Sequence, residues 1–138
     1  MLTDARTLPD RTKLEADLAI IGGGAAGITL ARAFAGSGVS VCLLESGGLE
    51  ADPEVQSLYQ GENAGINYSP SVTRLRFFGG STNHWGGYCR PLDAIDFEQR
   101  DWVPFSGWPI TVDELAPYYT QATDIVEIGS GRFDDLDY

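Results

Sequence analysis

Two short runs of consecutive apolar residues enclose a stretch with helical periodicity near the start of the chain. The first run, Leu18 to Ile21, is typical of a parallel strand that is covered on both faces. From Ala25 to Ala35 the apolar residues recur at helical spacing, and Val39 to Leu44 is the second apolar run. The pattern therefore predicts one strand–helix–strand unit of about 30 residues.

The remainder of the chain is less regular. Residues 47–70 contain glycine, asparagine and proline, with one short helix expected around Glu54 to Tyr59. Four glycines among residues 79–87 predict an irregular loop whose backbone can approach a ligand closely. Thr111-x-x-Glu114 has the spacing of a capping box and predicts a helix, which Pro117 is expected to kink or delay.

No third buried strand is apparent after Leu44. Two parallel strands alone leave unpaired edges and much apolar surface exposed, so we expect further strands to complete the sheet. The expected fold class is α/β, the βαβ start of a doubly wound parallel sheet that is incomplete in this chain. Residues 1–14 are interpreted as a polar N-terminal lead, and residues 15–138 as the first portion of a nucleotide-binding domain without its substrate-binding and catalytic region.

The first predicted strand ends in Gly22-x-Gly24-x-x-Gly27, and the second ends at Glu45. This is the dinucleotide-binding fingerprint in its required context of strand, turn, helix and strand followed by an acid. Gly22 suits the tight turn, Gly24 lets the backbone approach a diphosphate, and Gly27 allows close packing of helix and strand. The diphosphate would lie at the helix N-terminus, and the acid would accept hydrogen bonds from a ribose.

The fingerprint leaves the identity of the dinucleotide open. An acid at position 45 disfavours NADP, because its carboxylate would face the negative 2′-phosphate. NAD and FAD both remain compatible with the pattern. The alternative reading is a glycine-rich turn in some other α/β protein, with Glu45 simply solvated.

Composition narrows the classes of partner. The chain has 138 residues, with 9 Lys and Arg against 20 Asp and Glu, for a formal net charge of −11. Such a chain repels nucleic acid and anionic lipid, so neither is expected as a partner. No apolar stretch approaches the roughly 18 residues of a membrane span, and Cys42 and Cys89 lack metal-ligand spacing, so no metal is expected. The N-terminus lacks an apolar signal region; we expect a cytoplasmic protein, with periplasmic export alongside a partner as an open alternative.

Four segments resemble the glucose–methanol–choline (GMC) oxidoreductases, and together they extend from about Leu14 to Ala122. The segments are Asp17-Leu-Ala-Ile-Ile-Gly-Gly-Gly-Ala-Ala-Gly-Ile-Thr-Leu-Ala31, Leu43-Leu-Glu-Ser-Gly-Gly48, Phe78-Gly-Gly-Ser-Thr-Asn-His-Trp-Gly-Gly87, and Ser106-Gly-Trp-Pro-Ile110 with Asp113-Glu-Leu-Ala-Pro-Tyr-Tyr119. The resemblance implies a Rossmann-like FAD-binding domain. It also implies oxidation of a CH–OH group of an alcohol, sugar or polyol, with hydride transfer to flavin N5 and an electron acceptor that the sequence does not identify.

The resemblance also implies which residues contact FAD, with residues 60–110 forming the flavin-contacting loop and the segment after it. Those near the diphosphate and the adenosine ribose would be Gly22, Gly24, Ala26, Gly27, Glu45 and Ser46. Those along the diphosphate and the isoalloxazine ring would be Gly79, Gly80, Ser81, Thr82, Asn83, His84, Trp85 and Gly86. The catalytic base of the family matches no position here and is expected beyond Tyr138.

His84, the single histidine of the chain, has three interpretations. Pyranose oxidases, a related branch, carry a similar Thr-His-Trp stretch whose histidine is bonded covalently to the flavin, and His84 is a candidate for the same attachment. It is also a candidate for non-covalent packing against FAD, or for a purely structural loop histidine. For the whole chain, the alternatives are an NAD-dependent Rossmann oxidoreductase and a non-catalytic FAD-binding fragment or subunit.

Overall fold

The computed structural model describes residues 1–129, so the end of the predicted 15–138 portion lies outside the described residues. The chain divides into two compact units, Met1–Gly86 and the part from Gly87 onward, and each is described by itself. The elements of the first unit are η1 (Ala5–Thr7), β1 (Leu18–Ile21), α1 (Ala25–Ala33), β2 (Val41–Leu44), α2 (Pro53–Ser57), α3 (Pro70–Thr73) and η2 (Gly80–His84). The second unit has α4 (Ala94–Phe97) and α5 (Val112–Ile125).

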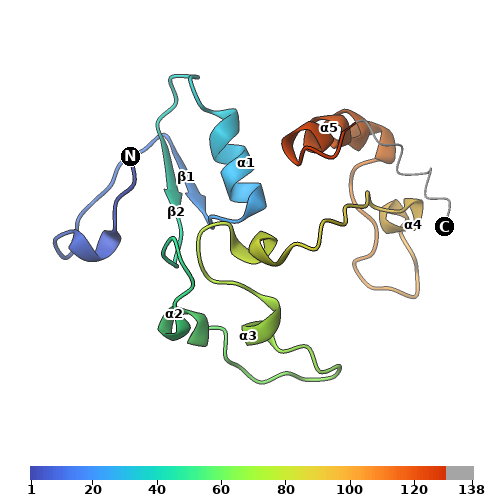
Figure 1. Ribbon diagram of the computed structural model, residues 1–138. Helices are drawn as coiled ribbons and strands as arrows, with labels where there is room; N and C mark the ends of the chain where they lie inside the picture. Colours follow the sequence, from blue (N-terminus) through green and yellow to red (C-terminus); the bar gives the residue numbers. More distant parts are fainter. Residues whose placement is uncertain (130–138) are drawn as a thin grey trace. The chain divides into compact units, whose positions relative to one another are not determined.

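The centre of the first unit is a parallel pair of strands with α1 alongside it (Figure 1). Leu18 pairs with Val41 and Ile21 with Leu44, which confirms the predicted strand–helix–strand unit. The helix ends at Ala33 rather than Ala35, because the Phe34 amide donates to a carbonyl three residues back and the chain leaves α geometry. The second strand begins two residues later than predicted.

Only one face of the sheet is covered within the described part of this unit. Ile20 is 6% exposed and faces α1, where a Cβ at Gly27 would lie 3.4 Å from its Cγ2. Because side chains alternate along a strand, the other face carries Ala19, Ile21, Cys42 and Leu44. Ile21 is 88% exposed there. The expectation of strands covered on both faces is therefore wrong for the described residues. The apolar run forms a strand as predicted, but α1 covers only one of its faces.

A reciprocal set of hydrogen bonds holds the two strands together where they begin. The Asp17 amide donates to Ser40 Oγ at 2.9 Å, and the Ser40 amide and hydroxyl both donate to Asp17 Oδ2, at 2.9 and 2.6 Å. The hydroxyl and then the amide of Ser40 lower the pKa of Asp17 below its usual value. Asp17 therefore sets the register at the start of the sheet.

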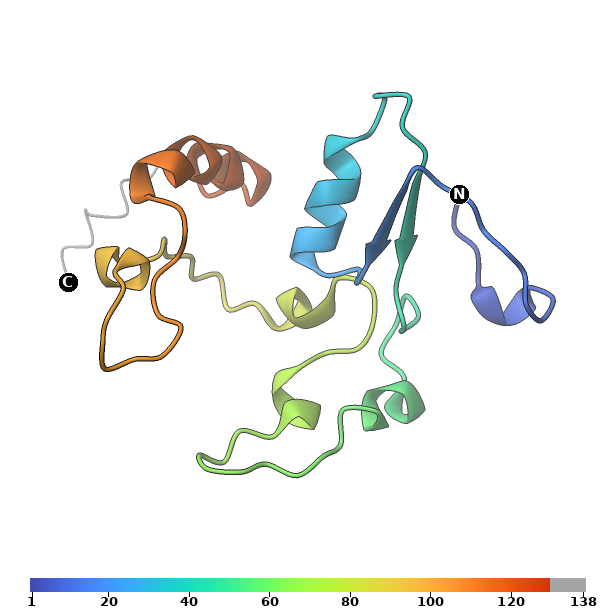
Figure 2. The same cartoon turned by 180° about the vertical axis from the view of Figure 1, so that it is seen from behind.

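Two short helices follow β2 and lie next to each other in both views (Figures 1 and 2). Asp52 caps α2 by accepting the Glu54 and Val55 amides, and Pro53 occupies the first turn. This helix confirms the one predicted around Glu54 to Tyr59, shifted slightly toward the N-terminus. The Gln56 side chain joins α2 to α3 by donating to the Ser71 carbonyl at 2.9 Å.

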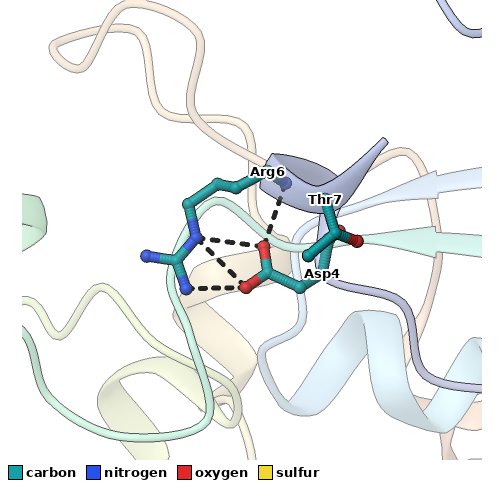
Figure 3. A network of polar contacts seen from close by, with 3 residues as sticks. All are labelled: Asp4, Arg6 and Thr7. Atoms are coloured by element: carbon teal, nitrogen blue, oxygen red, sulfur yellow. Dashed lines mark hydrogen bonds and ion pairs between the residues drawn. The ribbon is translucent and has the colours of Figure 1, made fainter. Parts of the chain in front are cut away.

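The polar N-terminal segment contains a local turn, η1, that is organised by one ion pair (Figure 3). Asp4 accepts the Arg6 amide at 3.0 Å and forms an ion pair with the Arg6 guanidinium at 2.7 Å. These bonds, the side-chain ones first, lower the pKa of Asp4 to about 2. All the groups are exposed, so the pair shapes the turn without anchoring it to the sheet.

In the second unit, α5 begins where the capping box predicts. Thr111 Oγ1 accepts the Glu114 amide, and Glu114 accepts the Thr111 amide at 2.7 Å. Pro117 lies inside the helix and does not delay its start, because the box already fixes the first turn. The Leu92 amide donates to the Tyr119 hydroxyl at 3.2 Å, which ties α5 to the segment before α4. Within residues 1–129, no helix combines the length and the apolar character that a membrane crossing needs.

The close packing of α1 on the sheet leads to a first prediction. A Cβ at Gly27 would lie 1.9 Å from the Gly22 carbonyl oxygen, so Gly27→Ala forces helix and strand apart. We expect a loss of about 1–3 kcal/mol in the free energy of unfolding, as for other overpacked positions. Urea unfolding followed by circular dichroism measures it.

The matched control is Gly61→Ala, where the added methyl meets nothing within 4 Å. This variant is expected to be as stable as the wild type or slightly more stable. Equal stabilities for the two alanine variants would contradict the packing role of Gly27.

Candidate functional site

Three turns from distant parts of the sequence meet where the two strands end. The Gly22 amide donates to the Leu44 carbonyl at 2.8 Å, so the first glycine turn continues directly from the sheet. The Phe78 amide donates to the Gly48 carbonyl at 2.9 Å, and the Gly79 amide donates to the Gly23 carbonyl at 2.7 Å. Backbone hydrogen bonds therefore bring the second glycine-rich loop against the fingerprint.

The Glu45 carboxylate lies at the centre of this junction. Its Oε2 accepts the Gly23 amide at 2.6 Å, and its Oε1 accepts the Gly47 amide at 2.9 Å and the Ser46 hydroxyl at 3.2 Å. Burial by itself raises the pKa of Glu45, but the bonds from Gly47, Gly23 and Ser46 outweigh it and lower the pKa below its usual value. The carboxylate is therefore ionised at neutral pH and fixed in orientation.

The N-terminus of α1 opens beside this carboxylate. Gly24 is the N-cap residue, has extended backbone geometry and provides no side-chain cap. A Cβ built on it meets nothing within 4 Å, so no other atom lies against this position. First-turn amides have no intrahelical acceptor and carry the positive end of the helix dipole, and they can hold an anion.

The second loop is more ordered than the irregular loop that its glycines predicted. It contains the 3₁₀ turn η2, which follows Gly79 in the left-handed region at φ +92°. Asn83 Nδ2 donates to the Phe78 and Gly80 carbonyls, both at 3.0 Å, and the Thr82 hydroxyl donates to the Gly79 carbonyl. The polar side chains thus satisfy the backbone of a tight turn, which is why the segment acquires regular structure.

This turn lies directly against the fingerprint. Gly24 and Gly79 form an isolated parallel β-bridge, and a Cβ at Gly80 would lie 3.4 Å from Gly24 Cα. On the loop side, Gly79 and Gly80 have positive φ angles of +92° and +57°, and a Cβ at Gly79 would lie 2.6 Å from the side chain of Asn83. Glycine is therefore favoured at these two loop positions, whereas a methyl group at Gly24 meets no other atom within 4 Å.

The structure thus brings together part of the predicted set. The residues in the junction are Gly22, Gly24, Gly27, Glu45, Gly79 and Gly80. Ala26 is exposed on the first turn of α1, and Ser46 is exposed with its hydroxyl turned to Glu45. Ser81 Oγ accepts the Leu75 amide at 3.2 Å, so its bond runs back along the loop. Thr82 and Asn83 lie within η2, and the last three residues of the predicted set, His84, Trp85 and Gly86, are exposed.

Three contributors were not predicted. Gly23 uses both its amide and its carbonyl in the junction, although the fingerprint treats it as a free position. Gly47 lies so close to the loop that a Cβ there would be 2.1 Å from the Arg76 carbonyl oxygen. The Gln56 side chain forms hydrogen bonds with the backbone of the segment before the second loop. Adjacent glycines after Glu45 were a usable signal for Gly47, whereas nothing in the sequence pattern distinguishes Gln56.

The chain was compared with known proteins, and no family model, curated protein or solved structure matched it.

The bonds of Glu45 predict a pH dependence of stability. Because its pKa is lower in the folded state than the usual value of about 4.3, the stabilisation is present above that pH and is lost as pH falls through the folded pKa. Glu45→Gln removes this contribution. We expect the difference in unfolding free energy between wild type and variant to shrink as pH falls from 6 to 3.

Urea unfolding at a series of pH values measures this difference. Glu50→Gln, at an exposed position in the same connection, is the matched control and is expected to follow the wild type. A wild type and a Glu45→Gln variant that differ by the same amount at every pH would contradict the assignment.

Proposed function

We propose that the junction of Gly23 with Glu45 and Gly79 is the diphosphate and ribose part of an FAD site in a Rossmann-like domain. The observation that carries the proposal is this hydrogen-bonded junction itself. It places an ionised carboxylate, an open helix N-terminus and a second glycine-rich loop within one small region. A dinucleotide needs a partner for its ribose, one for its diphosphate and one for its second half, and the junction can supply all three.

Glu45 retains the capacity to bind a ribose. A carboxylate offers about four lone-pair sites, and Oε1 accepts two donors here while Oε2 accepts one. A ribose hydroxyl can therefore donate to Oε2 without displacing a backbone amide. The same negative charge opposes a 2′-phosphate, which favours FAD or NAD over NADP.

The resemblance of the sequence to GMC oxidoreductases favours FAD over NAD. Bound FAD supplies the two-electron chemistry by accepting a hydride from a CH–OH donor, an alcohol or a sugar. In this proposal the described residues bind and orient the cofactor: the α1 N-terminus holds the diphosphate, and Gly79 to Gly86 lie along the flavin side. We assign no catalytic base among them. An NAD-dependent enzyme and a non-catalytic FAD-binding subunit are the alternatives.

Gly24→Ala tests the proposal without disturbing the fold. The added methyl has room in the protein and an allowed backbone geometry. In the proposed site the diphosphate approaches the backbone at Gly24, so the methyl would hinder its binding. We expect the wild type to bind FAD and the variant to bind it at least ten-fold more weakly, about 1.4 kcal/mol. Flavin fluorescence titration measures both affinities, and circular dichroism checks the fold.

Gly61→Ala is again the control and is expected to bind FAD like the wild type. Parallel titrations with NAD and NADP separate the alternatives. Tighter binding of NAD than of FAD would instead support an NAD-dependent oxidoreductase. A wild type that binds none of the three dinucleotides would contradict the proposal of a dinucleotide site.

For His84 we propose non-covalent packing against bound FAD. The residue is exposed at the end of η2, a turn that starts beside Gly24. Acid precipitation of the FAD-loaded protein is expected to release the yellow colour into the supernatant. Colour that stays with the precipitated wild type and is released from His84→Ala would instead establish covalent attachment at His84.

A further inference from the structure

Gln56 makes three hydrogen bonds to the segment that leads into the second glycine-rich loop. Its Nε2 donates to the Ser71 carbonyl at 2.9 Å and to the Arg74 carbonyl at 2.6 Å. Its Oε1 accepts the Arg76 amide at 3.0 Å. One side chain on the short helix α2 therefore satisfies backbone groups 15 to 20 positions later in the sequence. Only an amide carries both two donors and an acceptor on a single neutral group.

The braced segment is connected to the fingerprint by a short series of contacts. The Arg76 carbonyl packs against Gly47, the Phe78 amide bonds to the Gly48 carbonyl, and the Gly79 amide bonds to the Gly23 carbonyl. The segment is also tied forward into η2, because the Leu75 amide donates to Ser81 Oγ. A displacement of residues 74–76 therefore moves the loop that follows them.

A second contact joins the segment to Tyr59, three residues beyond Gln56 in the sequence. The Arg76 guanidinium lies over the Tyr59 ring, 4.7 Å from its centroid, in cation–π geometry. Within residues 1–129, the buried Nε of Arg76 has no hydrogen-bond partner. The arginine side chain therefore contributes stacking here, and the hydrogen bonds that join this segment to α2 are those of Gln56.

We propose that Gln56 is a positioning residue for the flavin side of the cofactor site. It touches no cofactor itself; it holds residues 74–76 so that Gly79 and η2 lie against Gly24. This inference rests on the proposed function. It goes further because it assigns a role in FAD binding to one neutral side chain outside both glycine-rich motifs. That role is to position the loop that contacts the flavin half of FAD.

The two halves of the ligand provide the test. ADP contains the groups assigned to Glu45 and the α1 N-terminus, whereas FAD also needs the second loop. Gln56→Glu places a carboxylate oxygen against the Ser71 and Arg74 carbonyls and repels them, while Gln56→Met keeps the length and removes all three bonds. Gln60→Glu is the matched control, since it makes the same change of charge at an exposed position four residues on.

We expect both Gln56 variants to bind FAD at least ten-fold more weakly than the wild type and to bind ADP within about three-fold of it. Calorimetric titration of the full chain with each ligand gives both values. Amide hydrogen exchange is expected to rise in residues 74–86 and to stay unchanged in residues 18–33. Gln60→Glu is expected to match the wild type in every measurement.

Unchanged FAD affinity in the Gln56 variants would overturn the inference. Equal weakening of FAD and ADP, or faster exchange throughout residues 18–33, would show that Gln56 has a general structural role and would overturn it as well. A wild type that binds ADP but not FAD would refute the role of the second loop alone. A wild type that binds neither ligand would refute the proposed function together with this inference.

Discussion

The hydrogen bond from the Gly23 amide to the Glu45 carboxylate is the contact on which the arrangement of the first unit depends. It joins the turn that follows β1 to the turn that follows β2, across 22 positions of sequence. Gly23 is buried, and an amide left without an acceptor there would cost the free energy of its desolvation. The same carboxylate holds Gly47, against which the segment before the second loop packs. A single acid therefore fixes both surfaces that receive that loop.

The remaining contacts of the junction are mostly between backbones. Gly23, Gly24 and Gly79 meet without intervening side chains, and the loop amides bond to carbonyls of the two turns. Side chains enter at few places: Glu45 at the strand ends, Asn83 inside η2, and Gln56 from α2. A junction of this kind leaves backbone donors and open space for a ligand, but it resists any substitution that separates the backbones.

Sequence reasoning succeeded where the determining interactions are local. The strands, α1 and the capping box of α5 follow from the spacing of apolar residues and from Thr111 and Glu114, which act within a few residues of themselves. The uncovered face of Ala19 and Ile21 was not predicted, because an apolar run identifies a strand without showing what packs on it. The junction of Gly23 with Gly79 and the brace at Gln56 depend on pairings between distant segments, which periodicity does not encode. The assignment to FAD remains a prediction from the resemblance.

The reciprocal bonds between Asp17 and Ser40 have a consequence for the order of folding. They close a loop of 23 positions, and the bond from Gly23 to Glu45 spans a similar distance, so each loses less chain entropy than the longer-range pairing of Gly79 with Gly23. Synthesis proceeds from the N-terminus, and the strand–helix–strand unit can therefore form before Gly79 leaves the ribosome. In that order of events, the second loop docks on a surface that Gly23 and Gly47 already form.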